Sequence, residues 1–307
     1  MDTHYNAYEK CTLCPHECGA DRYSKNNGFC NTGASYSVAS VCRHTGEEPV
    51  ISGKNGICNI FFSHCNMQCV YCQNYQISCN KSSIVVQNQE QDVIDKICNL
   101  LDSGCHALGF VSPSHCVIQM LDMIKKLHQR KYFPVIIYNT NGYDKTSTLK
   151  SLYSLIDVYL PDFKYADDVL AYKYSKVKNY TQTAIHAISE MINQTGVVLQ
   201  INNKGEASKG VIIRHLVLPG YIENSLNVLR LIAENFGNKV HVSLMSQYYP
   251  TIHVKNDCNL NRTLTDKEYD RVVDKLYKLG FENGWVQDIS SSNHYVPDFR
   301  RANPFDE

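Results

Sequence analysis

From about residue 56 onward, short apolar runs alternate with amphipathic stretches, and this alternation recurs six times. Stretches such as residues 117–127 and 266–279 carry apolar residues at helical spacing, whereas the runs between the stretches are short and continuous. The apolar runs cover residues 57–63, 107–111, 135–138, 156–160, 211–218 and 240–245. Alternating strands and helices are typical of a parallel sheet with right-handed crossovers. The pattern therefore predicts an α/β fold in which six strand–helix units curl into a partial (βα)6 barrel.

A cysteine loop follows the first predicted strand directly. Cys65, Cys69 and Cys72 have the spacing C-x3-C-x2-C. Three thiolates can hold three corners of a [4Fe-4S] cluster and leave the fourth iron open to another ligand. The alternative is a zinc site completed by His64 or Cys79. Because the functional residues of such barrels lie at the carboxyl ends of the strands, the position of the loop favours the open cluster.

A second group of cysteines lies in residues 1–45, which are rich in glycine turns and poor in apolar periodicity. We therefore divide the chain into a metal-binding segment, residues 1–45, and a barrel, residues 46–307. The four thiolates of this segment suffice for either a second [4Fe-4S] cluster, which we favour, or a structural zinc ion. They are Cys11, Cys14, Cys18 and Cys30. Cys116 and other cysteines within apolar stretches are expected to be small buried hydrophobic residues.

The charge of the chain bears on its partners and location. Thirty basic residues balance thirty acidic ones, and no basic block is present. This balance gives no support for a nucleic acid or an anionic membrane as a partner. The first residues lack the pattern of a signal peptide, and no apolar run is long enough to cross a bilayer. We therefore expect a cytoplasmic protein, in which clustered cysteines bind metal rather than form disulfides.

The three-cysteine loop, with Tyr71 before the third cysteine, resembles the signature of radical S-adenosylmethionine (SAM) enzymes. The resemblance implies that Cys65, Cys69 and Cys72 hold a [4Fe-4S] cluster whose open iron chelates SAM. In that family an electron from the cluster cleaves SAM to methionine and a 5′-deoxyadenosyl radical, which abstracts hydrogen from a substrate. The resemblance also implies that Tyr71 lies against the adenine, and that a reductase, flavodoxin or ferredoxin supplies the electron.

The resemblance covers nearly the whole chain. It is closest to homologues of the pyruvate formate-lyase activating enzyme that carry an N-terminal cysteine segment. Such a likeness implies a protein substrate, a glycine Cα of a partner enzyme, as one form of the activity. The stretches that carry it are residues 47–78, 139–142, 157–164, 214–220 and 295–299.

Polar side chains follow the other predicted strands. Asn139, Thr140 and Asn141 come after the third strand with a turn glycine. After the fourth, Asp162 and Lys164 lie on the same side of an extended chain, which is costly for buried charges unless they find partners. By the resemblance these residues contact SAM; an ordinary salt bridge is the alternative for the charged pair.

Two further SAM contacts are predicted. Ser112 follows the second strand where radical SAM enzymes commonly have an acidic residue, so its hydroxyl replaces that contact; a plain turn is the alternative. Arg214 and His215 are neighbours in the fifth strand and face opposite sides. We expect Arg214 to point into the barrel.

Three functions are compatible with these features. The favoured one is a radical SAM enzyme that abstracts hydrogen, with activation of a glycyl radical enzyme as one form. The second is radical SAM modification of a small molecule or an RNA base. The third is a non-catalytic iron–sulfur electron carrier or metal-binding protein, which the open-iron triad and the polar strand ends disfavour.

Overall fold

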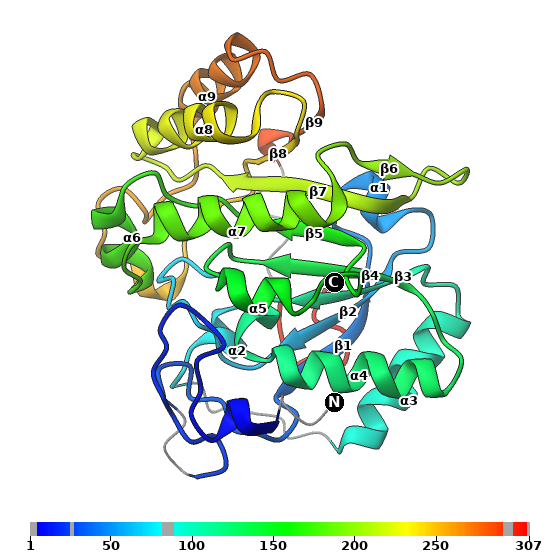
Figure 1. Ribbon diagram of the computed structural model, residues 1–307. Coiled ribbons are helices and arrows are strands. Elements are labelled where there is room, and N and C mark those ends of the chain that lie inside the picture. Colours follow the sequence, from blue (N-terminus) through cyan, green and yellow to red (C-terminus); the bar gives the residue numbers. More distant parts are fainter. Residues whose placement is uncertain (1–4, 25–27, 82–88, 291–296, 306–307) are drawn as a thin grey trace.

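The computed structural model describes residues 5–24, 28–81, 89–290 and 297–305 (Figure 1). Its main sheet has the strand order β1-β2-β3-β4-β5-β7-β8-β9, and β6 pairs with β7. The strands are β1 (Val38–His44), β2 (Ile57–Phe62), β3 (Ala107–Val111), β4 (Val135–Thr140), β5 (Val158–Pro161), β6 (Gln200–Ile201), β7 (Ala207–Leu216), β8 (His241–Met245) and β9 (Gly284–Val286).

All six predicted strands are present, as β2, β3, β4, β5, β7 and β8, and each pairs in parallel with the next. The predicted α/β partial barrel is thus confirmed. Three strands were not predicted: β9 extends the parallel series beyond β8, β1 pairs antiparallel with β2 at the other edge, and the two-residue β6 pairs antiparallel with β7. The start of β1 pairs Val38 with Phe62, and its end pairs His44 with Ile57.

Most of the helices cover one face of the sheet, as Figure 1 shows. The helices of the described ranges are α1 (Pro49–Ser52), α2 (Tyr75–Ser78), α3 (Glu90–Asp102), α4 (Val117–Gln129), α5 (Thr146–Lys150), α6 (Asp168–Ser175), α7 (Tyr180–Thr195), α8 (Ile222–Phe236) and α9 (Asp266–Lys278), with 3-10 turns at Tyr5–Tyr8, Pro113–His115 and Ile252–Val254. Alternate strand residues such as Ile60, Phe110 and Tyr138 pack in one hydrophobic cluster with helix residues such as Ile97 and Met120. This cluster is the main core of the molecule.

The opposite face of the same strands forms the inside of the barrel. Its lower part is a smaller apolar cluster that includes Ile57, Ala107 and Ile137, against which Ile51 of α1 packs. Short α1 therefore fills the interior below the carboxyl ends of the strands. Because the apolar layer is confined to this lower part, the space above it is left to polar side chains.

Both ends of the chain contribute to the barrel edge. The division predicted at residue 45 stays a prediction, and β1, which lies before it, pairs with β2. At the other end, the rings of Phe299 and Phe305 lie 5.3 and 5.6 Å from that of Phe61 in β2. Tyr295 and Val296, which begin the last stretch of the resemblance, lie outside the described residues. No helix of the described ranges has the length and apolar surface that a bilayer span requires.

Candidate functional site

The three-cysteine loop leaves β2 at the carboxyl edge of the sheet. Its backbone is tied to the end of α6, since Gln68 N donates to Ser175 O (3.0 Å) and Val70 N donates to Tyr174 O (2.9 Å). The hydroxyl of Thr251, in the segment after β8, donates to Val70 O (2.6 Å). The end of α6 and the segment after β8 therefore both hold the loop in place.

Each thiol of the loop accepts at least one hydrogen bond. Cys65 Sγ accepts from Met67 N (3.3 Å) and Asn141 Nδ2 (3.4 Å), Cys69 Sγ from Ser175 Oγ (2.9 Å), and Cys72 Sγ from Ser78 Oγ (3.2 Å). Hydrogen bonds to sulfur stabilise a thiolate and tune the potential of a cluster bound to it. These donors therefore fit a set of cluster ligands.

The electrostatics of the loop also suit a set of cluster ligands. Burial raises the pKa of the Cys69 thiol to about 11, and burial likewise raises the pKa values of Cys65 and Cys72. The three groups lie near enough to influence one another's pKa, while Lys164 lowers those of Cys69 and Cys72. A metal must therefore displace the protons. In the described part of the chain, no three His, Cys, Asp or Glu side chains already stand at metal-binding distance.

Asn141 and Tyr71 lie next to this loop. The Asn141 amide donates to Cys65 Sγ and to Asn66 Oδ1 (2.8 Å). Tyr71 is 5% exposed, and its hydroxyl lies 2.5 Å from that of Tyr165. The structure thus brings two predicted SAM residues to the cysteines, although the hydroxyl of Tyr71 is engaged with protein.

Thr140 and Ser112 are placed differently. The Thr140 hydroxyl, 1% exposed, donates to the carboxylate of Asp144 and accepts from Gly142 N (3.2 Å), so it holds the turn after β4. Ser112 has a left-handed backbone (φ 53°), and its N–H donates to Asn139 O (2.7 Å). Both residues shape the strand ends through bonds within the protein.

Asp162 and Lys164 follow β5 and form an ion pair with each other, with side chains 20% and 15% exposed. Burial lowers the pKa of Lys164, but the Asp162 carboxylate and the Cys69 thiol outweigh it and raise the pKa above its usual value. The ammonium therefore stays charged and lies close to the cysteine loop.

Arg214 points into the barrel, whereas His215 bonds to Phe163 O (2.7 Å) and to Ser225 Oγ of α8 (2.9 Å). The Arg214 guanidinium forms ion pairs with Glu47 and Glu48, which precede α1. Arg214 Nε donates to Glu48 Oε1 (2.8 Å). We expected Arg214 to contact SAM; its observed partners are two carboxylates of the protein.

Glu47 and Glu48 were missed as site residues, although the adjacent acids before a proline were visible as part of the resemblance. Burial raises the pKa of Glu47, but Arg214 outweighs this effect and lowers the pKa to about 2. Asn59 Nδ2 donates to Glu47 Oε1 (3.0 Å). The carboxylate is therefore ionised at any pH near neutrality.

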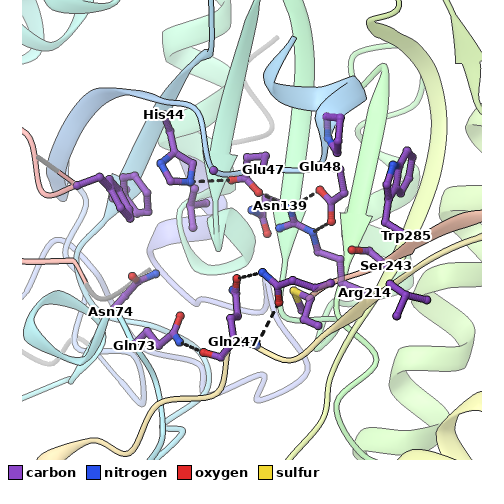
Figure 2. A pocket seen from close by; sticks show the side chains of 18 residues that line it. His44, Glu47, Glu48, Gln73, Asn74, Asn139, Arg214, Ser243, Gln247 and Trp285 are labelled. Carbon is purple, nitrogen blue, oxygen red and sulfur yellow. Dashed lines mark hydrogen bonds and ion pairs between the residues drawn. The ribbon is translucent and has the colours of Figure 1, made fainter. Parts of the chain in front are cut away.

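A cavity of about 390 Å³ opens beside this ion network (Figure 2). Gln73 and Asn74, which follow Cys72, line it, as does Asn139 at the end of β4. Figure 2 shows Glu47 and Glu48 on one side of Arg214, with Trp285 and His44 at opposite ends of the view. The cavity is thus the polar upper interior of the barrel, and it adjoins the cysteine loop.

The four N-terminal cysteines differ in their burial. Cys11, Cys14 and Cys30 are buried and Cys18 is exposed. A Cβ atom on Gly28 would come 2.6 Å from Cys18 Sγ, so the chain passes close to that thiol. Burial, together with the nearby Cys30 and Cys11, raises the pKa of Cys14 to about 12. That these four sulfurs bind one metal stays a prediction.

Arg22 lies among these thiols and is 2% exposed. It donates to His115 O (2.5 Å) and Cys30 Sγ (3.6 Å), and its Nε has no partner. No carboxylate pairs with it within 4.0 Å in the described ranges, and Cys11, Cys30 and Cys116 are the acidic groups that most favour its charge. A buried guanidinium needs anionic partners, so a metal that converts the thiols to thiolates fits this site.

The module packs on the three-cysteine loop. His16 Nε2 lies 2.8 Å from Asn66 O, and Asn80 accepts from Cys65 N (3.1 Å) while donating to Phe29 O (2.6 Å). Lys145, before α5, pairs with Glu17 (2.5 Å). The two cysteine groups are therefore direct neighbours, as Figure 1 shows for the N-terminal segment beside α2 and α5.

Comparison with known proteins gives the following relatives. Residues 51–185 match the family model of a 4Fe-4S single cluster domain. Uncharacterized protein MJ0674 of Methanocaldococcus jannaschii is 28% identical over 284 residues, which cover 90% of this chain and 77% of that protein.

Among solved structures, HydG, a maturase of the [FeFe]-hydrogenase, has a TM-score of 0.52 at 14% identity over 78% of this chain. HydG of Carboxydothermus hydrogenoformans has a TM-score of 0.50 at 14% identity over 72% of this chain. The chain spans about half the length of these maturases, 53% and 50%. At this identity the likeness concerns the fold. The chain therefore shares the fold of these maturases, and within that fold residues 51–185 match a 4Fe-4S single cluster domain.

Proposed function

We propose that this protein is a radical SAM enzyme in which Cys65, Cys69 and Cys72 hold a [4Fe-4S] cluster. When bound, that cluster would supply the electron that cleaves SAM to methionine and a 5′-deoxyadenosyl radical for hydrogen abstraction. The observation that carries the proposal is the meeting of three hydrogen-bonded thiols with a polar cavity at the carboxyl edge of the sheet. Chemistry in barrels of this type is located at this edge.

Residues around the loop have separate tasks in this proposal. Asn141 and Ser175 donate to sulfur, which favours the thiolate forms that a metal requires. Asp162 and Lys164 offer a carboxylate and an ammonium to the zwitterionic end of SAM, and Tyr71 offers a ring face to its adenine. Thr140 and Ser112 orient the strand ends that carry these groups.

Arg214 has a different task from the one that the sequence suggested. Because two carboxylates already hold its guanidinium, we assign it to the support of Glu47 and Glu48 at the cavity floor. Asn139 lines the same cavity.

The further components of the proposal are an electron donor, a substrate and a second metal. A reductase, flavodoxin or ferredoxin supplies the electron, and the reaction takes place in the cytoplasm. A glycine Cα of a partner enzyme is one candidate substrate. Cys11, Cys14, Cys18 and Cys30 hold a second [4Fe-4S] cluster, and the buried charge of Arg22 supports an anionic metal–thiolate centre there.

The direct test is release of 5′-deoxyadenosine and methionine by anaerobically reconstituted protein given SAM and a strong reductant. Replacing Cys65, Cys69 and Cys72 together by Ala should abolish this release and leave the far-UV circular dichroism unchanged. Cys258→Ala, which removes an exposed thiol, is the matched control and should keep full activity. Continued turnover by the triple variant would refute the proposal.

A further inference from the structure

The cavity is separate from most of the predicted SAM contacts. Of those eight residues, only Asn139 and Arg214 line it. Its wall nevertheless continues directly from the cysteine loop, since Gln73 and Asn74 follow Cys72. The cavity is thus positioned to receive the molecule from which a radical formed beside the loop would take hydrogen.

The charges that line the cavity do not balance. Among the described residues that line it, Glu47, Glu48, Arg214 and His44 are titratable. Burial lowers the pKa of His44, which is therefore neutral at pH 7. Two carboxylates face one guanidinium, so the lining carries one net negative charge on side chains that are 5–9% exposed. A buried charge of this kind is costly unless a cation or strong hydrogen-bond donors complete it.

The remaining lining combines aromatic rings with amides. Trp285 and Phe305 lie on the wall, and Gln247 and Asn139 add amide groups. The face of an indole ring attracts an organic cation. Aromatic walls above an anionic floor favour an alkylammonium or guanidinium group over a carboxylate or a phosphate. A volume of about 390 Å³ lies in the range of small-molecule pockets and leaves room for a lysine or arginine side chain.

We propose that this cavity is the substrate pocket and that the substrate enters it with a cationic nitrogen group, which Glu47 and Glu48 bind. The assignment of the cavity to the substrate rests on the proposed radical SAM function; its preference for cations does not. A free amine and a lysine or arginine side chain of a peptide share this chemistry, so the proposal includes both as sources of the cationic group.

The preference can be measured without any turnover. Trp285 is the single tryptophan of the chain and lines the cavity, so its fluorescence reports occupancy. Reconstituted full-length protein, without SAM or reductant, is titrated with n-butylguanidinium, n-butylammonium, the neutral n-butylurea and butyrate, with calorimetry as a second readout. The cations should bind about tenfold or more tightly than butylurea, the difference that one charge-assisted contact provides. Butyrate should not bind.

Two variants test whether the excess negative charge of the lining binds the cation. Glu48→Gln leaves Arg214 paired with Glu47 and removes the excess charge, so it should fold and lose about tenfold in affinity for butylguanidinium. Glu234→Gln removes a carboxylate from the exposed ion pair with Arg230 and should change nothing. Blocked lysine and arginine amides, added to the same titration, separate a peptide source from a free amine.

Equal binding of butylurea and butylguanidinium by the unaltered protein would overturn the proposal, and this arm does not depend on the folding of a variant. Unchanged affinity in Glu48→Gln would overturn it as well. The outcomes are separable from those of the proposed function. Cation binding without release of 5′-deoxyadenosine would contradict the radical chemistry alone, and release without cation preference would contradict the pocket assignment alone.

Discussion

Arg214 illustrates how one side chain acquires a role from partners that are remote in the chain. Its guanidinium meets Glu47 and Glu48, which precede it by 167 and 166 positions. Both carboxylates are held below the barrel mouth by the turn that leads into α1. Each carboxylate stabilises the guanidinium, because a buried charge left alone costs several kcal/mol.

Glu47 should make stability depend on acid pH. Its folded pKa of about 2 lies below its usual value, so the stabilisation is complete above about pH 4.5 and is lost as pH falls toward 2. Denaturant unfolding at several pH values should therefore show that Glu47→Gln is destabilised relative to the unaltered protein at pH 6, with the difference shrinking below pH 4.5. A difference that does not vary with pH would show that the carboxylate charge contributes nothing to stability.

The end of β5 shows how a strand presents two side chains together. Asp162 and Lys164 are two positions apart in extended chain, so both point to the same side, and there they pair. Asp162 continues the parallel pairing through a bridge to Arg214 of β7. The strand thus places an ion pair between the cysteine loop and the cavity floor.

Asp162→Ala and Lys164→Ala should each weaken SAM binding about tenfold to a hundredfold, since one charge-assisted contact is worth about 1.5–3 kcal/mol. Calorimetric titration of reconstituted protein with SAM measures this, with iron content as the check that the cluster is retained. Arg271→Ala, which breaks an exposed pair with Glu223, is the control. Normal SAM affinity in both variants would mean that the pair is an ordinary salt bridge.

The strands differ in how far they could be predicted from the sequence. The six parallel strands were predictable because buried strands of a parallel sheet are continuous apolar runs. β1 was not, because Val38–His44 mixes apolar, polar and charged residues in a cysteine-rich segment, and it forms a strand only by pairing with β2. β9 has three residues and gives no periodic signal.

The residues of the candidate site also differ in how far they could be predicted from the sequence. The cysteines and the polar strand ends were predictable, because their spacing and their place after strands are local properties of the sequence. The ion network was not, since only the fold brings Glu47 and Glu48 to Arg214. The contact of His16 with the loop at Asn66, fifty positions away, could not be predicted either.

At the scale of the whole molecule, the two cysteine groups should behave as two metal centres. If both are cubane clusters, intact protein holds about eight irons, and the triple variant of Cys65, Cys69 and Cys72 holds about four. Replacing Cys11 and Cys14 by Ala should loosen the first 45 residues to proteolysis, because metal replaces a core there. Metal analysis and limited proteolysis measure both effects.

The zinc alternative gives a different count: about four irons and one zinc in intact protein, and the zinc alone in the triple variant. The protease experiment has the same expected result with either metal. If metal were present only at the triad and the N-terminal segment stayed resistant, the idea of a second centre would be wrong.

The docking of the N-terminal module bears on the order in which the molecule is completed. Thr12 and Leu13 are held by Lys145 and Thr148, which lie 133 and 135 positions later in the chain. On the ribosome, the module therefore emerges long before the surface that it binds exists. The module is therefore secured only after about half of the barrel has been made.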